Sequence, residues 1–347
     1  MQSLLFHCRA GQETTLCAEL QHRLPEKGLY GYAQPGPGLV IWQAGQNLLP
    51  WQHKNLQSDL VFSRSLLLVL QELPNLNSKD RVADVLAALS DLSLSGQFGG
   101  LRIEETDDPQ TRDLATLGKK LTHPMRAALR KQGYLTTTEK QDMPWLVLVL
   151  IGSSSAYLCQ SILAETSPYP MGVLRLKMPS RAPSRSTLKL DEACRLMLDD
   201  DQDWFIADRW SVDLGAAPGG WTWQLVKRQQ RVYAIDNGPM DDELMASGLV
   251  EHLKADGFRW QPPQKVDWLV CDMITQPQRT TELMLSWLQQ GWATRAIFNL
   301  KLPMKKRWPM VASCLEQLEQ GLASHYRIKA RQLYHDRDEV TVVIYPE

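Results

Sequence analysis

The sequence predicts an α/β fold: a parallel sheet with crossover helices and an antiparallel terminal hairpin, preceded by an α+β region. Two observations support this fold class. After residue 187, short apolar strands alternate with helical segments, which is typical of a parallel sheet. Within that part, residues 212–228 (VDLGAAPGGWTWQLVKR) have the pattern of a strand that turns through glycines into a helix, as in sheets that bind nucleotide-like ligands. The C-terminal part is therefore predicted to be Rossmann-like.

The N-terminal part mixes strands and helices without that alternation. Its segment SKDRVADVLAALSDL, for example, begins with a serine that can cap a helix and carries apolar residues at helical spacing. A succession of helix, strands, helix and hairpin indicates an α+β unit. We predict strands at 3–8, 38–43, 60–73 and 100–106, helices at 12–24, 78–92 and 109–132, and a closing hairpin of 145–152 with 155–163.

A segment rich in proline, glycine and basic residues separates the two parts. Its sequence, TSPYPMGVLRLKMPSRAPSRST, is that of a charged interdomain linker. After it we predict parallel strands at 210–214, 231–235, 250–254, 266–272 and 294–300, and then two strands joined by a polar turn within 327–347. We therefore divide the chain into domains at 1–58, 59–165 and 188–347, with the basic linker at 166–187.

Composition and charge limit the classes of protein to which the chain can belong. Of its 347 residues, 44% are hydrophobic and 22% are charged, as in soluble globular proteins. No apolar run approaches the roughly 18 residues of a membrane span, and no secretory signal pattern is present at the start. The six scattered cysteines form no CxxC pair, which disfavours a zinc site and favours a reduced, cytoplasmic protein. With a net charge of −1, nucleic-acid binding would have to use local basic patches.

The glycine turn predicts which ligand the sheet binds. The order from Gly215 to Gly220 does not fit the GxGxxG pattern of dinucleotide sites, and Pro218 lacks the backbone donor that a phosphate would need. S-adenosylmethionine, an adenosine ligand without phosphates, suits the turn better. Three carboxylates that follow successive strands would meet its methionine portion (Asp213), its ribose hydroxyls (Asp236) and its adenine amino group (Asp256). The predicted cofactor contacts are Ser186, Asp213, Ala217, Pro218, Gly219, Gly220, Trp221, Asp236, Asp256 and Asp272.

The motif DLGAAPGGW resembles the cofactor motif of the heat-shock-type, or FtsJ-like, ribose 2′-O-methyltransferases, which use a Lys-Asp-Lys-Glu tetrad. The resemblance implies that the catalytic residues are Lys189, Asp272, Lys301 and Glu339, each of which occurs in the expected order and element.

The resemblance extends through PSRSTLKL, FNLKLPMKKR and ARQLYHDRDEVTV to essentially the whole chain. The members of the family that it matches methylate a cytidine ribose in large-subunit (23S) ribosomal RNA. They also carry a ferredoxin-like segment and a THUMP RNA-binding domain before the catalytic domain. The resemblance thus implies a ferredoxin-like domain at 1–58, a THUMP domain at 59–165 and 23S rRNA as the partner.

The chemistry of the tetrad follows from the reaction. A ribose hydroxyl is a poor nucleophile until its proton leaves, so the site needs a base. A lysine has an ordinary pKa near 10.4, and two lysines that lie close together should lower the pKa of one of them. We assign Lys301 as the base, Lys189 and Glu339 as groups that orient the hydroxyl, and Asp272 as the support of Lys301. No metal is required.

Cys271 introduces an alternative, because a cysteine is the nucleophile of pyrimidine C5 methyltransferases. It directly precedes Asp272 on a predicted strand, so the two side chains point to opposite faces. If Asp272 faces the cofactor, Cys271 faces the core, and a packing role is favoured. Methylation of an exocyclic amine is disfavoured, because CDMI lacks the Asn/Asp-Pro-Pro-aromatic motif.

Three further alternatives stay open: a ribose methyltransferase for another RNA, an NAD-dependent oxidoreductase, and a non-catalytic RNA-binding assembly factor. The missing GxGxxG pattern and the two lysines argue against the oxidoreductase, and the intact tetrad argues against the assembly factor. The residues themselves do not identify the target nucleotide. We expect a monomer.

Basic residues flank the tetrad along the sequence and could bind phosphates. The predicted RNA contacts are Arg175, Lys177, Arg181, Arg185, Lys305, Lys306, Arg307, Arg331 and Arg337. The resemblance to THUMP domains adds a set in the predicted helix at 109–132: Arg112, Lys119, Lys120, Arg126, Arg130 and Lys131. Trp221 and Trp223 could stack on a base, but core packing is favoured for both.

Overall fold

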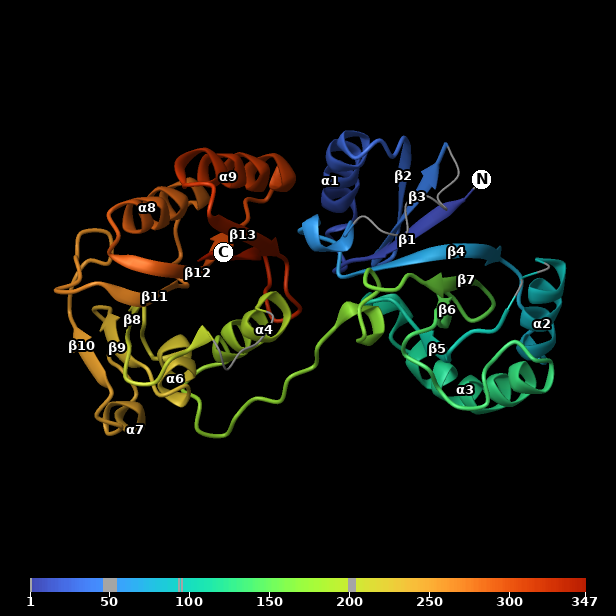
Figure 1. Ribbon diagram of the computed structural model, residues 1–347. Coiled ribbons are helices and arrows are strands. Elements are labelled where there is room, and N and C mark those ends of the chain that lie inside the picture. Colours follow the sequence, from blue (N-terminus) through green and yellow to red (C-terminus); the bar gives the residue numbers. More distant parts are fainter. Residues whose placement is uncertain (1, 46–54, 93, 95, 199–203) are drawn as a thin grey trace. The chain divides into compact units, whose positions relative to one another are not determined.

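A computed structural model describes residues 2–45, 55–92, 94, 96–198 and 204–347 (Figure 1). The chain forms two compact units, Met1–Val173 and Leu174–Glu347. Each unit has its own seven-stranded sheet and its own hydrophobic core, so each is described by itself. Among the described residues, no helix combines the length and the apolar character that crossing a membrane requires.

The first unit is built on a mostly antiparallel sheet. Its strand order is β2-β3-β1-β4-β7-β6-β5, in which β5 and β6 pair in parallel. Because β1 pairs with β4, the predicted domains 1–58 and 59–165 contribute to one continuous sheet, and the boundary between them stays a prediction. The strands are β1 (Ser3–His7), β2 (Gly31–Gly36), β3 (Leu39–Ala44), β4 (Ser65–Leu73), β5 (Leu101–Glu104), β6 (Leu146–Leu150) and β7 (Ala156–Ser161).

Helices α2 (Arg81–Asp91) and α3 (Leu114–Lys131) cover one face of this sheet (Figure 1). Leu89 of α2 and Met125 of α3 are buried in one core with alternate residues of β6, because successive side chains of a strand point to opposite faces. Helix α1 (Glu13–Glu26) packs against β2 and β3. Short 3-10 helices lie at η2 (Gln57–Asp59), η3 (Pro109–Thr111) and η4 (Pro170–Gly172).

The predicted strand at 60–73 is wrong in its first part, because β4 begins only at Ser65. The backbone N–H groups of Val61 and Phe62 donate to the carboxylate of Glu19 on α1, at 2.7 and 2.9 Å, rather than to a neighbouring strand. A short buried apolar run has the same composition whether or not it is a strand. Strand β2 was not predicted, and its Pro35 fits its position at the edge of the sheet.

The second unit confirms the predicted Rossmann-like sheet with an antiparallel end. Its strand order is β10-β9-β8-β11-β12-β14-β13, parallel as far as β12, while β14 runs antiparallel to both β12 and β13. The strands are β8 (Trp210–Leu214), β9 (Arg231–Ile235), β10 (Val250–Leu253), β11 (Val266–Cys271), β12 (Ala293–Lys301), β13 (Tyr326–Arg331) and β14 (Glu339–Pro346).

Helices cover both faces of this sheet, α4 and α6 on one face and α8 and α9 on the other (Figure 1). Leu190 of α4 and Leu225 of α6 share a core with Trp268 of β11 and Ile297 of β12. Parallel strands end at the same edge, and β14 begins at that edge because it runs the opposite way. The helices are α4 (Thr187–Met197), α6 (Gly220–Lys227), α7 (Asp242–Met245), α8 (Pro277–Gln289) and α9 (Arg307–Gly321).

Candidate active site

Four charged residues from four different elements meet at the carboxyl edge of the second sheet. Lys189 lies in the first turn of α4, and Asp272 directly follows β11. Lys301 ends β12 and Glu339 begins β14, and the register of these antiparallel strands places the two residues directly opposite each other. The pairing of β12 with β14 therefore fixes half of the cluster, and α4 and β11 supply the other half.

The two lysines and the two carboxylates alternate in a closed ring. Lys189 donates from Nζ to Asp272 Oδ2 at 3.0 Å and also contacts Glu339 Oε1. Lys301 Nζ donates to Asp272 Oδ1 and to Glu339 Oε2. Each ammonium thus contacts both carboxylates, and the four formal charges sum to zero. Lys301 is the more exposed of the two lysines, 21% against 14%.

A second set of polar residues, which the sequence did not predict, holds the ring in place. Asn299 donates from Nδ2 to Asp272 Oδ1 at 2.9 Å, and the hydroxyl of Thr341 donates to Asn299 Oδ1 at 2.8 Å. Asn299 lies two residues before Lys301 on β12, so the two side chains share a face of the sheet. That spacing was the available signal in the sequence.

Helix α4 is tied to the segment that precedes Glu339. Glu192, one turn after Lys189, accepts hydrogen bonds from the backbone N–H groups of Tyr334 and His335, both at 2.9 Å, and from His335 Nδ1 at 2.7 Å. Its carboxylate is almost fully buried. This contact links the helix that carries Lys189 to the chain that leads into Glu339.

For Lys301, the assigned base, the ring contradicts the expectation of a lowered pKa. Burial on its own lowers the pKa of Lys301, but the carboxylates of Asp272 and Glu339 outweigh it, so the pKa is raised. Burial likewise raises the pKa of Asp272, and the two lysines more than offset it, so that pKa is lowered. The prediction expected the repulsion between the two lysines to prevail over the two carboxylates, whereas in the structure each ammonium is held by both carboxylates.

The glycine turn brings the starts of α4 and α6 together. Gly219, which directly precedes α6, has a φ of +117°, a backbone conformation that favours glycine. A Cβ at Gly220 would lie 2.2 Å from Ser186 Oγ and 2.3 Å from Ser184 Oγ, so only glycine allows this approach. The hydroxyls of Ser184 and Ser186 are themselves 2.6 Å apart. The glycines therefore admit protein side chains as close neighbours.

The three predicted acidic residues have different surroundings. Asp236, after β9, accepts from the backbone N–H of Ala217 at 3.0 Å and from that of Gly238 at 2.7 Å. The side chain of Asp256 is 52% exposed. Asp213 is only 1% exposed, and the hydroxyl of Thr222 donates to it at 2.7 Å. Burial, with the nearby charge of Asp272 as a lesser cause, raises the pKa of Asp213 to about 7.

Trp221 and Cys271 lie in the interior. Trp221 is 2% exposed and belongs to the core between α4, α6 and the sheet. Cys271 is fully buried, and that burial raises the pKa of its thiol to about 12. A thiol with that pKa is not a thiolate nucleophile near neutral pH. Trp223 is half-buried, with the ammonium of Lys227 5.5 Å from its ring centroid.

Most of the predicted RNA contacts in the second unit are exposed. Arg307 is the clearest exception, because it is half-buried. It pairs with Asp338 at 2.9 Å and donates to the carbonyl of Pro303 at 3.1 Å. These contacts stabilise the loop that follows Lys301. Arg331 is also half-buried. The exposed residues are Arg175, Lys177, Arg181, Arg185, Lys305, Lys306 and Arg337.

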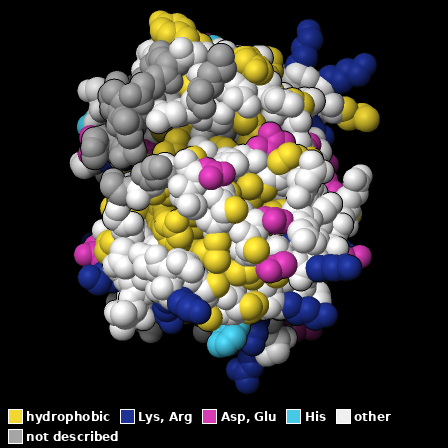
Figure 2. All heavy atoms as spheres, turned by 90° about the vertical axis from the view of Figure 1, so that its right-hand side faces the viewer, with side chains coloured by type: hydrophobic (Ala, Val, Ile, Leu, Met, Phe, Trp, Pro, Cys, Tyr) yellow, Lys and Arg dark blue, Asp and Glu magenta, His cyan; other side chains and the backbone are white. Residues whose placement is uncertain are grey.

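The basic residues of the first unit are partly engaged with the protein itself. Arg126 pairs with Glu139 at 3.1 Å, and Arg130 donates to the carbonyl of Thr136 at 3.3 Å, while Lys119 and Lys120 are exposed. In the face drawn in Figure 2, Asp and Glu side chains lie among hydrophobic ones in the middle, and Lys and Arg side chains lie toward the upper right, right and lower edges. The described residues visible there form no continuous basic surface.

Comparison with known proteins gives matches along both units. Family models match at residues 1–67 (RlmM ferredoxin-like domain), 80–162 (ribosomal RNA large subunit methyltransferase M, N-terminal) and 182–317 (FtsJ-like methyltransferase). The ribosomal RNA large subunit methyltransferase M of Stenotrophomonas maltophilia (strain R551-3) is 42% identical over 352 residues, 99% of this chain and 97% of its own. The same enzyme of Xanthomonas campestris pv. campestris (strain B100) is 42% identical over 350 residues, 99% of both chains.

Among solved structures, that of TrmN from Thermus thermophilus covers 100% of both chains at 16% identity. The TM-score between the two structures is 0.38.

Proposed function

The chain belongs to the ribosomal RNA large subunit methyltransferase M family, and from this premise we propose that it methylates the 2′-hydroxyl of a cytidine ribose in 23S rRNA, with S-adenosylmethionine as the methyl donor. The observation that carries the proposal is the closed ring of Lys189, Asp272, Lys301 and Glu339 at the carboxyl edge of the sheet.

The residues around the glycine turn fit the proposed methyl donor. Each oxygen of Asp236 accepts one backbone N–H, which leaves lone pairs for ribose hydroxyls. The exposed Asp256 can accept from an amino group, whereas the buried Asp213, whose pKa burial raises to about 7, is only partly ionised near neutral pH. When bound, S-adenosylmethionine supplies an electrophilic methyl group on its sulfonium.

Lys301 is the proposed base. It is the more exposed amine of the ring and stands where β12 ends, so a hydroxyl can approach its Nζ from solvent. As an ammonium it cannot accept a proton, so it first releases one to solvent and then takes the proton of the ribose hydroxyl on Nζ. Asp272 and Glu339 hold Nζ in position during both transfers.

Two exposed apolar side chains lie close in sequence to members of the ring and support a nucleotide as the substrate. Ile274 follows Asp272 by two residues and Met304 follows Lys301 by three, and each is 94% exposed. Large apolar side chains with this exposure have no packing role in the protein as it stands. We assign them to contact with the base of the target nucleotide, whose faces are apolar.

The test is methyl transfer by Lys301→Met to large-subunit rRNA that lacks the modification, with ribose methylation mapped along the RNA. We expect transfer to fall by about 100-fold or more, because general base catalysis contributes on that order. Binding of the RNA and of S-adenosylhomocysteine should persist. The exposed Lys265→Met is the matched control and should transfer as the wild type does. Undiminished transfer by Lys301→Met would refute the assignment of the base.

The same experiments separate the alternatives. Thermal stabilisation by NAD but not by S-adenosylhomocysteine would favour an oxidoreductase. RNA binding by the wild type without methyl transfer to any RNA would favour an assembly factor. Methylation mapped to a nucleotide other than cytidine would correct the substrate and leave the reaction in place.

A further inference from the structure

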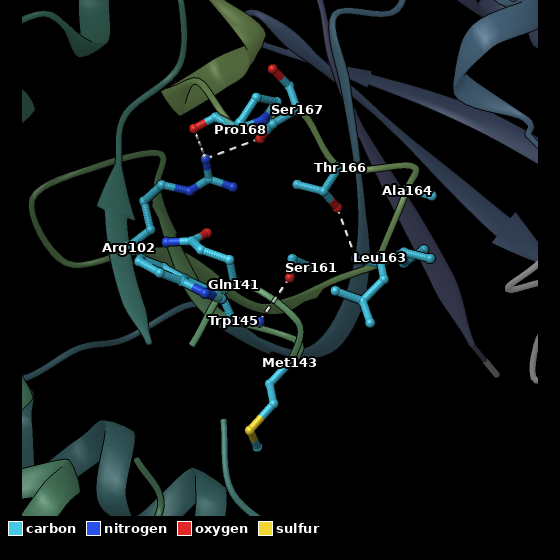
Figure 3. A pocket seen from close by; sticks show the side chains of 11 residues that line it. Arg102, Gln141, Met143, Trp145, Ser161, Leu163, Ala164, Thr166, Ser167 and Pro168 are labelled. Carbon is cyan, nitrogen blue, oxygen red and sulfur yellow. Dashed lines mark hydrogen bonds between the residues drawn. The ribbon is translucent and has the colours of Figure 1, made fainter. Parts of the chain in front are cut away.

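A pocket of about 240 Å³ opens within the first unit, and neither the tetrad nor the glycine turn contributes to it (Figure 3). Three pieces of chain line it: strand β5, the segment that leads into β6, and the end of β7 with the segment after it. The lining residues are Arg102, Gln141, Met143, Trp145, Ser161, Ile162, Leu163, Ala164, Thr166, Ser167 and Pro168.

Arg102 presents a fixed positive charge to the pocket. Its Nη1 donates to the backbone carbonyls of Ser167 and Pro168, both at 3.1 Å (Figure 3). Its Nε is buried and has no hydrogen-bond partner within the described residues. No carboxylate is among the lining residues. Glu104, two residues further along β5, is held by His7 and by the N–H of Met171 and also interacts electrostatically with Arg102. Because Nε is buried, the guanidinium meets a ligand in the pocket through its positive charge and not through Nε.

Trp145 offers a fixed aromatic surface. Its indole Nε1 donates to the carbonyl of Lys140 at 2.9 Å, and its backbone N–H donates to Ser161 Oγ at 2.7 Å. A Cβ at Gly100 would lie 2.7 to 2.8 Å from three ring atoms, so one side of the ring packs on that glycine. The rest of the ring borders the pocket, into which the amide of Gln141 also points (Figure 3).

These groups match one chemical class of ligand. An aromatic surface, a guanidinium and an amide can stack on a base, bind a phosphate and hydrogen-bond a base edge. The volume is below the roughly 300 Å³ at which sites for larger ligands begin, so one nucleotide unit suits it better than a dinucleotide or a cofactor. A paired base in a duplex could not enter, because its faces are already stacked.

We propose that this pocket binds one unpaired nucleotide of the RNA substrate, with its base on Trp145, its edge at Gln141 and its phosphate or a base acceptor at Arg102. The choice of RNA as the source of the nucleotide rests on the proposed function. The pocket would make the first unit a reader of single-stranded RNA, in addition to the site at the tetrad.

The experiment uses the full chain with a labelled single-stranded RNA oligonucleotide, the same sequence as a blunt duplex, and free nucleoside monophosphates. The variants are Trp145→Leu, Trp145→Phe, Arg102→Gln and Gln141→Ala. Arg81→Gln is the matched control, because Arg81 also clamps loop carbonyls, those of Ser153 and Ser78, but does not line the pocket.

We expect single-strand affinity to fall about tenfold in Trp145→Leu and in Arg102→Gln, and to stay within about twofold of the wild type in Trp145→Phe, which can still stack. Arg81→Gln should bind as the wild type does, and duplex affinity should not change in any variant. If Trp145→Leu loses its fold by circular dichroism, Gln141→Ala decides, since that side chain is exposed, and it should weaken binding about threefold.

Wild-type single-strand affinity in the pocket variants, or an equal loss for the duplex or in Arg81→Gln, would overturn the proposal. So would failure of the wild type to bind any single strand. If the pocket variants lose binding of nucleoside monophosphates but keep binding of single-stranded RNA, the ligand of the pocket is a free nucleotide and not RNA. Methyl transfer by the wild type is measured in parallel, so failure of the proposed function is read independently of the pocket.

Discussion

Lys301 is held as an ammonium between Asp272 and Glu339, so its action as a base depends on how often it loses a proton. These carboxylates raise its pKa above the ordinary lysine value, despite the opposing effect of burial, so the neutral amine is a small fraction near neutral pH. We expect the single-turnover rate of methyl transfer to rise between about pH 7 and about pH 9, approaching tenfold per unit, because the neutral fraction grows tenfold per unit below the pKa.

The measurement is a rapid-quench rate at saturating RNA and S-adenosylmethionine. The residual rate of Lys301→Met should be flat over the same range. A wild-type rate that is flat or falls with pH would mean that proton removal by Lys301 does not limit the reaction.

Ile274 and Met304, the two exposed apolar residues that follow Asp272 and Lys301 in the sequence, make a second prediction about single residues. Ile274→Ser and Met304→Ser should each raise the KM for RNA about fivefold, since each removes apolar contact with the base worth about 1 kcal/mol. Calorimetric affinity for S-adenosylhomocysteine should be unchanged. Ile206→Ser, which alters a side chain 52% exposed in the same unit, is the control. An equal rise in the KM for RNA in Ile206→Ser would contradict the assignment of Ile274 and Met304 to contact with the base.

At the level of elements, α4 and the segment before β14 are held together by Glu192. Its carboxylate accepts three hydrogen bonds from Tyr334 and His335. A glutamine side chain has only one oxygen that can accept, so it could keep only some of these hydrogen bonds. We expect Glu192→Gln to cost about 2 kcal/mol in the free energy of unfolding, as hydrogen bonds to a charged group do. It should also lower kcat more than it changes KM, because Lys189 and Glu339 lose their common support.

Urea unfolding and steady-state kinetics check this prediction. Glu316→Gln, an exposed glutamate on α9, is the control and should be close to neutral in both measurements. A Glu192→Gln variant with lowered stability but an unchanged kcat would limit Glu192 to a structural role.

The elements also show which features a sequence can predict. Apolar runs and glycine turns are local, so β8, β9, β11 and β12 were predicted closely. Contacts of a side chain with a distant backbone are not local, and for that reason the capture of Val61 and Phe62 by Glu19 was missed.

The site divides in the same way. The four tetrad residues came from motifs in a known order, whereas Asn299, Thr341 and Glu192 matter only through tertiary contacts. The direction of the Lys301 pKa was also missed, because it depends on two carboxylates that the fold brings to one ammonium.

At the scale of the whole molecule, each unit contains a fully buried carboxyl whose pKa is raised to about 7. Burial raises the pKa of Glu19 in the first unit and of Asp213 in the second unit to about 7. Between the unfolded pKa and about pH 7, each group is protonated in the folded state and ionised in the unfolded state. The unfolded state then binds fewer protons at these two positions. The contribution of each group to the stability of its unit therefore falls as pH rises through this window and is constant above it.

Since each unit has its own sheet and core, we expect two calorimetric transitions and predict that Glu19→Gln and Asp213→Asn act on different ones. In the wild type, each carboxyl should lower the free energy of unfolding of its own unit by on the order of 3 kcal/mol between about pH 5 and about pH 8. The substitution should abolish this decrease in the transition of that unit, because an amide does not ionise. The other transition should keep its wild-type pH dependence, so each variant is the control for the other. A single transition, or the same change in both transitions from either variant, would show that the two units unfold as one.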